Sequence, residues 1–451
     1  MKLPALRSTG VAASFLAAAI SGTAWSAGDI TDGLLDPSFD GDGKLDINIR
    51  AGAFDSAHAV AVAPDGKIYL VGGSYLLGDP ILNLTAIVRL NGDGTVDKTY
   101  DGDGIATFDL ESSGYLIGGA IVQSDGKLLF PVRQSSRSIV CRVLTDGNLD
   151  LAYGGSQTGC HQLPEASRIE SIALQPDGYA VVAGYRGSQG AVYRLDPQGH
   201  LDANFANQGE VILAPGQLLD IAVAPDGKLV VVGRFQPITD FEVFRLHADG
   251  GLDFGWGQLG HVTVAFDQGI SDYDRATAVS VLSDGSILVA GDVNYGSSGH
   301  QRAGIAKLDP ITGALVDSFA ENGKGYYDNC PGELGPCTTH IEDMFVQSDG
   351  RIVMTGYTER VSFPADFFVL RVFNDGYVDT EFGDWWGWGG IAKIGFDLAG
   401  GGDTNTDDFA FAAVNHGGRI LVAGRADVSD GSHFAVARLT NDRIFTDDYD
   451  H

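Results

Sequence analysis

The chain has 451 residues and carries 59 acidic against 29 basic side chains, which gives a formal net charge of −30. This acidity argues against a nucleic-acid partner, because the phosphates would be repelled. It fits a protein that attracts cations, but the simpler interpretation is a surface that is charged for solubility.

The N-terminal segment has the pattern of a secretory signal peptide. Lys2 and Arg7 precede an apolar stretch at residues 11–20, and the small residues Ala24, Ser26 and Ala27 follow. The apolar stretch is shorter than the roughly 20 residues that a membrane span requires. We therefore predict a signal peptide at residues 1–27 and a mature chain, residues 28–451, that is exported to the periplasm or the exterior of a bacterium without membrane insertion.

One unit then repeats along the chain, and an Asp-Gly turn is its first marker. The turn lies between two apolar, β-rich runs, which is typical of a tight β-hairpin. Its seven copies, the last one degenerate, are at residues 64–67, 124–127, 176–178, 225–228, 283–285, 348–351 and 416–419.

A second marker stays in register with the first. It is a basic residue followed by an apolar one, Arg-Leu in most copies, and it comes after each turn by a similar interval. The seven pairs are Arg89-Leu90, Arg142-Val143, Arg194-Leu195, Arg245-Leu246, Lys307-Leu308, Arg371-Val372 and Arg438-Leu439. Because the basic residue recurs in every repeat, we expect it to anchor its repeat by pairing with a turn aspartate and not to bind a ligand.

The first full repeat predicts four strands. Runs before and after its turn give two, residues 86–90 give a third and residues 105–108 a fourth, and no segment has a convincing helical period. Four short strands repeated seven times favour an all-β, seven-bladed β-propeller of four-stranded blades. The repeats start near residues 56, 114, 169, 217, 275, 340 and 408.

The two ends of the chain indicate a closed ring. The seventh repeat has three predicted strands and stops before a fourth, whereas residues 33–50 resemble the end of a repeat placed before the first full one. Such an offset lets the N-terminal strand complete the last blade and removes two open sheet edges. We therefore expect residues 28–451 to form a single propeller domain, closed by that strand.

The repeat resembles the delta-60 repeat family of bacterial exported proteins. The matching segments include residues 35–39 (Leu-Asp-Pro-Ser-Phe), 175–178 (Gln-Pro-Asp-Gly) and 201–205 (Leu-Asp-Ala-Asn-Phe). The resemblance covers nearly the whole mature chain and implies β-propeller-like repeats. It implies almost nothing about activity.

Four cysteines in an exported chain predict two disulfide bonds. Cys330 and Cys337 bracket a short loop rich in proline and glycine, so we expect them to pair. Cys141 and Cys160 would then form the second bond, between segments of one repeat that are expected to be neighbouring strands. No Cys-x-x-Cys spacing occurs, which argues against a zinc or redox site.

Propeller topology separates two faces. The stereotyped turns share one face, which we call the turn face, and the irregular loops share the other, which we call the loop face. Binding is expected on the loop face, because its loops are free to differ. The loops are at residues 75–84, 268–275, 294–302, 329–340, 358–366 and 399–408, and Asp272, Tyr273, Tyr295 and Arg360 are candidate binding residues within them.

The innermost strands supply a second candidate site. Asp220 and Asp343 occupy equivalent positions six residues before their turns, where most other repeats have small residues. His58, Glu170, His340 and Glu342 are close to these positions in sequence. These side chains predict either a site for a cation or a polar ligand at the channel mouth, or merely solvated acids that line a channel.

Two Asp-rich turns offer closely spaced carboxylates of the kind that calcium loops use. They contain Asp40, Asp42 and Asp46 in one case and Asp101 and Asp103 in the other. Neither has the distal glutamate of a twelve-residue EF-hand loop. The alternative is an ordinary glycine turn in which each aspartate accepts local backbone hydrogen bonds, so calcium is the one cofactor that we keep open.

We find no nucleophile elbow, zinc motif, phosphate loop or dinucleotide motif. The favoured interpretation is therefore a non-enzymatic, monomeric binding scaffold that recognises a protein or a glycan through its loop face. The alternative is an extracytoplasmic hydrolase or lyase of polysaccharides that uses Glu170, Asp220 and Asp343, since paired acids are recognised by geometry and not by spacing. A cluster of three tryptophans within residues 385–388 fits sugar stacking or packing between blades.

Overall fold

The computed structural model describes residues 32–76, 83–235, 240–268, 274–296, 300–327, 337–360, 363–383, 389–396, 398 and 406–441, without the side chains of 112–117, 360 and 363. All of these residues belong to one compact unit, Thr31–His451. They form strands and turns, and this part of the chain contains no helix with the length and apolar character of a membrane span. The predicted signal peptide and the tryptophan cluster lie outside the described residues.

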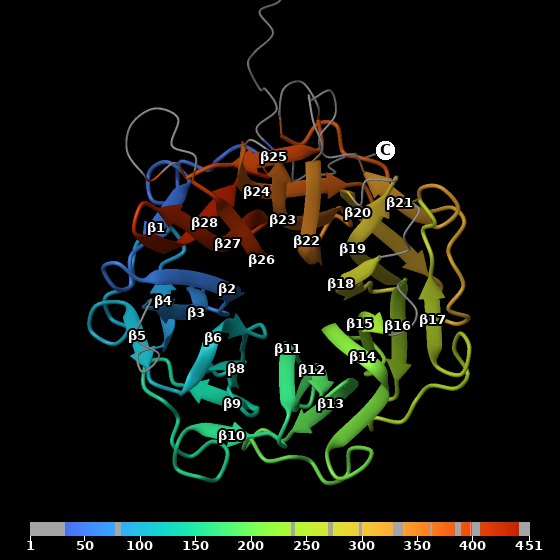
Figure 1. The fold of residues 1–451 in the computed structure, drawn as a ribbon, viewed down its shortest axis with the longest axis horizontal. Helices are drawn as coiled ribbons and strands as arrows, with labels where there is room; N and C mark the ends of the chain where they lie inside the picture. The colour runs from blue at the N-terminus through green and yellow to red at the C-terminus, as the bar shows by residue number, and fades with distance from the viewer. Residues whose placement is uncertain are drawn as a thin grey trace, which may run out of the picture. The chain divides into compact units, whose positions relative to one another are not determined.

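The fold is all-β and propeller-like (Figure 1). Each repeat begins with its innermost strand, and these strands are β2 (Phe54–Val62), β6 (Ser112–Ile117) with β7 (Ile121–Val122), β11 (Ser167–Leu174), the second half of β14 (Glu210–Val223), β18 (Arg275–Val281), β22 (Cys337–Val346) and β26 (Asp408–His416). The second strands follow the Asp-Gly turns and are β3 (Ile68–Tyr75), β8 (Leu128–Gln134), β12 (Ala180–Arg186), β15 (Leu229–Phe235), β19 (Ile287–Tyr295), β23 (Ile352–Arg360) and β27 (Arg419–Val428).

The third strands carry the Arg-Leu marker and are β4 (Leu84–Leu90), β9 (Ser138–Val143), β13 (Gln189–Leu195), β16 (Phe241–Leu246), β20 (His300–Leu308), β24 (Phe363–Val372) and β28 (Gly431–Leu439). The outermost strands are β5 (Ile105–Phe108), β10 (Cys160–Gln162), the first half of β14, β17 (His261–Val264), β21 (Lys324–Tyr327), β25 (Ile391–Ile394) and β1 (Lys44–Ile47). Strand β14 pairs with β13 through its first half and with β15 through its second half, so it links two repeats without a loop.

The innermost strands surround the centre of the ring in Figure 1. Each of them contacts the innermost strand of the next repeat, and β26 of the last repeat contacts β2 of the first, so the circuit is closed. The N-terminal strand β1 pairs antiparallel with β28 from Lys44↔Ala437 to Ile47↔Phe434. The last group of strands is thus built from both ends of the described chain.

Hydrophobic clusters lie between neighbouring repeats. In one of them Val71 and Ile87 of the first repeat pack against Phe130 and Val132 of the second, and all four are fully or almost fully buried. Burying a side chain such as Phe130 contributes about 1.5–3 kcal/mol. Each sheet has apolar side chains on both faces, so it needs a neighbouring sheet on each side. A circular arrangement gives every sheet two neighbours.

The recurrent arginine is an anchor, as predicted. Arg89 Nε donates to Asp97 Oδ2 at 2.8 Å, and the guanidinium lies 4.6 Å from the ring centroid of Tyr100. A second nitrogen donates to the carbonyl oxygen of Thr145 in the following repeat. The same combination of aspartate and aromatic ring, with a bond into the next repeat, recurs at Arg142, Arg194, Arg245, Arg371 and Arg438.

The fifth repeat departs from this pattern. Lys307 replaces the arginine, and Val316 occupies the position where the other repeats have the paired aspartate, since its amide donates to Lys307 as that of Asp97 does to Arg89. The buried Tyr327 hydroxyl donates instead to the Gly376 carbonyl of the next repeat at 2.6 Å. One tyrosine therefore makes the bond between repeats that an arginine makes elsewhere.

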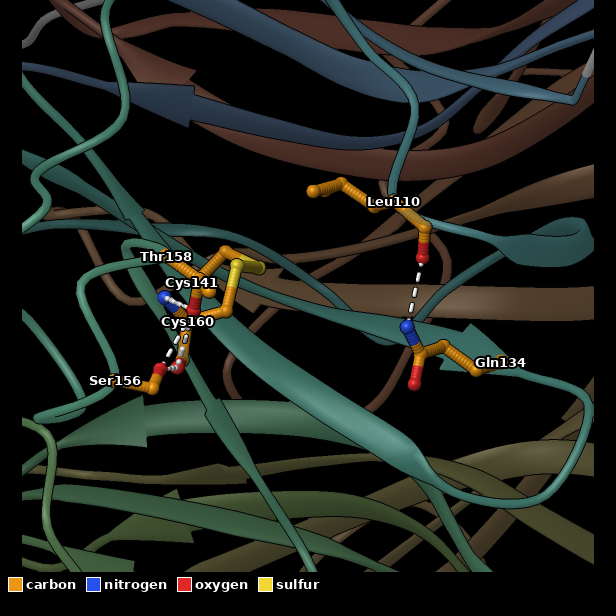
Figure 2. The surroundings of a disulfide bond; sticks show 6 residues. All are labelled: Leu110, Gln134, Cys141, Ser156, Thr158 and Cys160. Atoms are coloured by element: carbon orange, nitrogen blue, oxygen red, sulfur yellow. Dashed lines mark hydrogen bonds between the residues drawn. A yellow bond between two sulfur atoms is a disulfide. The ribbon is translucent and has the colours of Figure 1, made fainter.

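The Cys141–Cys160 disulfide is present, as predicted, and joins directly opposed residues of β9 and β10. Figure 2 shows the Ser156 and Thr158 hydroxyls beside it, both donating to the Cys160 carbonyl. Nearby, the Gln134 amide donates to the Leu110 carbonyl at 2.9 Å. Cys337 is also disulfide-bonded, but its predicted partner Cys330 lies outside the described residues.

A bulge interrupts the pairing of the first and second strands in most repeats. It occurs, for example, between Ala57 and Ala59 in β2 and between Ile341 and Asp343 in β22. The opposing residue is glycine, because a Cβ on Gly72 or Gly356 would lie within 2 Å of a carbonyl oxygen of the bulged strand. This contact explains why the second apolar run of the repeat ends in glycine.

Candidate functional site

The bulged strands line a central cavity of about 570 Å³. A bulge breaks the alternation of a strand, so two consecutive residues of one strand reach the same space. His58, Glu170, Asp220 and Asp343 all line this cavity, so the structure brings four of the predicted residues together. Its further lining includes Thr277, Arg275, Glu342, Ser171 and Phe411.

Asp220 and Asp343 are used as ties between repeats. Asp220 accepts hydrogen bonds from Ser171 Oγ at 2.7 Å and from the Val279 amide at 2.8 Å, so it joins three consecutive repeats. Asp343 accepts from the Met344 and Ala413 amides at 2.7 and 2.8 Å. Burial raises the pKa of Asp220 to about 6 and that of Asp343 to about 7, although these hydrogen bonds act in the opposite direction.

The two glutamates of the cavity lie beside arginines. Glu170 forms an ion pair with Arg133 of β8. Glu342 Oε1 is 3.9 Å from Arg275 Nη2, and burial raises the pKa of Glu342 to about 7 despite this cation. The pKa of Glu170 is also raised by burial, which the charge of Arg133 partly offsets.

A second cavity of about 260 Å³ adjoins the first, and we call it the mouth cavity. It shares Arg275 and Glu342 with the central cavity, and its other lining residues are Arg234, Asp292, Gln301, His340 and Tyr357. These residues come from the beginnings of first and third strands and the ends of second strands, which places the mouth cavity toward the loop face.

Asp292 organises the mouth cavity. It is 1% exposed and accepts hydrogen bonds from Arg275 at 3.0 Å and from the Ile341 amide at 2.8 Å. Burial by itself would lower the pKa of His340, but the Asp292 carboxylate, 3.6 Å from Nδ1, together with Glu359 and Glu342, raises the pKa overall. The predicted residue His340 is therefore held by a buried acid.

Aromatic rings form a continuous series from the mouth cavity into the central cavity. The centroids of His340 and Tyr357 are 4.8 Å apart, those of Tyr357 and Phe409 4.8 Å, those of Phe409 and Phe411 6.4 Å, and those of Phe411 and His58 4.6 Å. All five side chains are half-buried. Burial and the charge of Arg425 lower the pKa of His58 to about 3, so this ring is neutral at physiological pH.

Tyr295, a predicted loop-face residue, lies at the end of β19 and is 37% exposed. The Arg302 guanidinium is 3.5 Å from its ring centroid, and the exposed ring of Tyr326 is 6.5 Å away. We call these three residues the Tyr295 cluster. Asp272 and Tyr273 lie outside the described residues, and for Arg360 the structure gives only backbone pairing with Cys337 and Phe363.

The aspartates of the Asp-rich turns form local hydrogen bonds. Asp42 and Asp103 each accept the backbone amide two residues later, at 2.9 Å, and Asp46 is 2.7 Å from His433. Asp40 and Asp101 have positive φ angles of 48°. Within the described ranges, no group of three or more histidine, cysteine, aspartate or glutamate side chains is arranged to hold a metal ion.

The sequence did not single out several residues of the site. Arg234, Arg275 and Tyr357 lie on separate strands with no shared motif and meet only in the mouth cavity, and Arg133 lies apart from them beside Glu170. The sequence did single out His58, Glu170 and Glu342, because each directly precedes a predicted channel position, and the bulge explains why both neighbours face the cavity.

Comparison with known proteins agrees with this architecture. Residues 63–100, 175–205, 224–253, 282–315, 347–382 and 418–442 match a family described as "Domain of unknown function (DUF5122) beta-propeller", which indicates a β-propeller repeat family. These segments lie in six of the repeats. The second repeat, in which Val132 replaces the glycine opposite the bulge and β6 and β7 pair separately with β8, is not among them.

No curated protein matches the sequence. Among solved structures, the chain is similar to a protein of unknown function from Dyadobacter fermentans at 14% identity, over 88% of this chain and 99% of that one, with a TM-score of 0.41. It is similar to the Dos1 propeller at 11% identity, over 85% and 93% of the two chains, with a TM-score of 0.46. It is also similar to the polysaccharide lyase Uly1 at 11% identity, over 85% and 90%, with a TM-score of 0.43.

Proposed function

We propose that this chain is an exported β-propeller of seven four-stranded blades, closed by its N-terminal strand, and that it works as a binding scaffold. Its partner is a protein or a glycan that docks on the loop face. The closed circuit of innermost strands and the pairing of β1 with β28 support the architecture. The Cys141–Cys160 bond supports export, because such bonds persist mainly outside the cytoplasm.

The hydrogen bonds that Asp220 and Asp343 accept are the observation that favours a binding function over a catalytic one. A general acid or base needs a carboxylate oxygen that is free to face the substrate. Both oxygens of each aspartate accept hydrogen bonds from neighbouring backbone amides or from Ser171, and two of those amides belong to the next repeat. These carboxylates therefore hold the ring together.

The two faces differ in what they offer a partner. On the turn face the aspartates satisfy their own turns, as when Asp65, Asp226 and Asp349 each accept the amide two residues on. On the loop face the Tyr295 cluster presents two exposed rings and a guanidinium. Tyrosine and arginine are enriched at binding hot spots, and this supports docking on the loop face.

A polysaccharide-active hydrolase or lyase is the second candidate. It is favoured by Glu342, whose pKa of about 7 suits proton transfer near neutral pH, and by His340 and Tyr357 in the adjoining mouth cavity. The test is whether the protein releases reducing or unsaturated ends from a polysaccharide. If it does, and if Glu342→Gln abolishes the release, the protein is an enzyme and not a scaffold.

Affinity capture tests the scaffold. The purified protein is immobilised and exposed to envelope and extracellular extracts of the source cell, in parallel with a Tyr295→Ala/Tyr326→Ala double variant. The matched control is Tyr377→Ala, which removes a tyrosine that is 56% exposed on the turn face. We expect one dominant partner, lost with the double variant and kept with the control, while the melting temperature stays unchanged. If only Tyr377→Ala abolished capture of the partner, the interface would lie on the turn face and the proposed docking surface would be wrong.

A further inference from the structure

We infer that the mouth cavity and the central cavity together bind the terminal sugars of a neutral glycan. This inference rests on the proposed function, because it names the partner class of the same face. The two cavities share Arg275 and Glu342, so a ligand that enters at the loop face can extend from one into the other. The central cavity alone is within the size range of typical small-molecule sites.

One wall supplies stacking surfaces. Tyr357 lines the mouth cavity, Phe411 and His58 line the central cavity, and Phe409 lies between Tyr357 and Phe411 at ring-centroid distances of 4.8 and 6.4 Å. Each ring keeps part of its surface open, and His58 is uncharged at neutral pH. Sugar rings have apolar C–H faces that pack on aromatic rings, so Tyr357 can hold one sugar in the mouth cavity and Phe411 another in the central cavity.

The opposite side supplies hydrogen-bonding groups. Glu170, Ser171 and Thr277 line the central cavity there, and Glu342 stands at the junction of the two cavities. Arg275 and Gln301 add donors at the mouth. Acceptors and donors in such proximity match sugar hydroxyls, each of which donates one hydrogen bond and accepts others.

The charge distribution favours a neutral ligand. A cation would need carboxylate oxygens with free lone pairs, but Asp220 and Asp343 accept backbone amides, and Glu170 and Glu342 lie beside Arg133 and Arg275. An anionic sugar would bring its charge close to four carboxylates of the central cavity. Neutral hydroxyl groups can donate hydrogen bonds to the acids and accept them from the arginines, without the charge repulsion or the lack of free ligand oxygens that a charged ligand would meet.

The test is calorimetric titration of the full chain with four kinds of neutral trisaccharide, built of glucose, galactose, mannose or xylose. A glucosamine trisaccharide and a galacturonate trisaccharide serve as the cationic and anionic probes. We expect at least one neutral trisaccharide to bind, and Phe411→Ala to weaken it roughly tenfold or more, because a stacking surface is lost. Phe254→Ala is the control, since that ring is 65% exposed on the turn face, and it should leave binding unchanged.

Hydrogen exchange of the unaltered protein gives a second measurement that does not depend on the folding of a variant. The bound trisaccharide should slow exchange in β22, β23 and β26. Binding of only the charged trisaccharides, binding of none, or protection confined to other strands would overturn the inference. If no sugar binds while partner capture still depends on Tyr295 and Tyr326, the inference fails and the proposed scaffold stands. If a sugar binds in the cavities while capture ignores these tyrosines, the proposed docking surface fails instead.

Discussion

Arg438 Nε donates to Asp36 Oδ2 at 2.6 Å and thereby joins two residues that are 402 positions apart in the chain. The same guanidinium donates to the Gly92 carbonyl of the first repeat and stacks over Phe39. In the other anchors of this kind the aspartate follows its arginine within one repeat. Here the N-terminal segment supplies the aspartate and the aromatic ring, so this anchor forms only when the two ends meet.

Replacing Asp36 should therefore open the ring at its junction. The Asp36 and Arg438 side chains are 3% and 4% exposed, so Asp36→Ala leaves a buried guanidinium without its counter-charge. We expect the free energy of unfolding to fall by about 3–5 kcal/mol, measured by urea denaturation. Asp65→Ala, which removes an exposed turn aspartate, should cost less than about 1 kcal/mol. Equal effects of the two substitutions would show that the junction is not a special point of stability.

The stability of the protein should depend on pH through Glu342. Its pKa rises from 4.5 to about 7 on folding, because burial penalises the charged form. A raised pKa gives stability that is fully present below pH 4.5 and is lost as the pH rises through 7. Wild-type protein should lose up to about 3 kcal/mol of unfolding free energy from this group between pH 4.5 and 8.

Glu342→Gln should flatten that part of the curve, because it cannot ionise. Arg275, Asp292, His340 and Asp343 face this group in both proteins, so the difference between the two curves reports Glu342 together with its charge coupling to His340 and Asp343. Urea denaturation at several pH values provides the measurement. Parallel curves for the two proteins would mean that Glu342 is not held in a raised-pKa environment.

The Tyr327 hydroxyl, which replaces the arginine anchor of the fifth repeat, should contribute measurably to stability. Tyr327→Phe removes the donor to the Gly376 carbonyl and leaves that buried acceptor without its partner. We expect a loss of about 1–3 kcal/mol in unfolding free energy. Tyr326→Phe, in the exposed neighbour, is the control and should change stability by less than about 0.5 kcal/mol. A negligible effect of Tyr327→Phe would mean that this hydroxyl does not stabilise the contact between the fifth and sixth repeats, which Asp292 and the Ile341 amide also join.

The glycine opposite each bulge should tolerate no side chain. In Gly356→Ala the new Cβ would lie 1.8 Å from the His340 carbonyl oxygen, so the bulge of β22 would have to move. We expect the free energy of unfolding to fall by about 3 kcal/mol, as measured by thermal and urea denaturation. The control is Gly251→Ala, where the nearest atom is 3.5 Å away. If Gly356→Ala unfolds like the wild type, the bulge is not held by this contact.

Repeated local chemistry is what the sequence by itself determined. Strand residues flank each Asp-Gly turn, and the Arg-Leu marker is followed by the aspartate and the aromatic ring that its arginine contacts. These interactions lie within a few residues of one another, so one repeat is enough to specify them. The offset ends likewise predicted where β1 would pair, because an incomplete last repeat leaves one strand position to be filled.

The composition of the cavities was decided only by the tertiary structure. Strict strand alternation would send one of Glu342 and Asp343 inward, yet the bulge turns both toward the centre. Whether an inward acid acts as a tie or as a ligand group depends on the amides that the next repeat presents, as with Ala413 and Asp343. Arg275, His340, Tyr357 and Phe409 come from three consecutive repeats and meet because these repeats pack side by side, whereas His58 reaches Phe411 only because the ring closes. Local sequence specifies the strands, whereas the site depends on which residues of distant strands the closed ring places side by side.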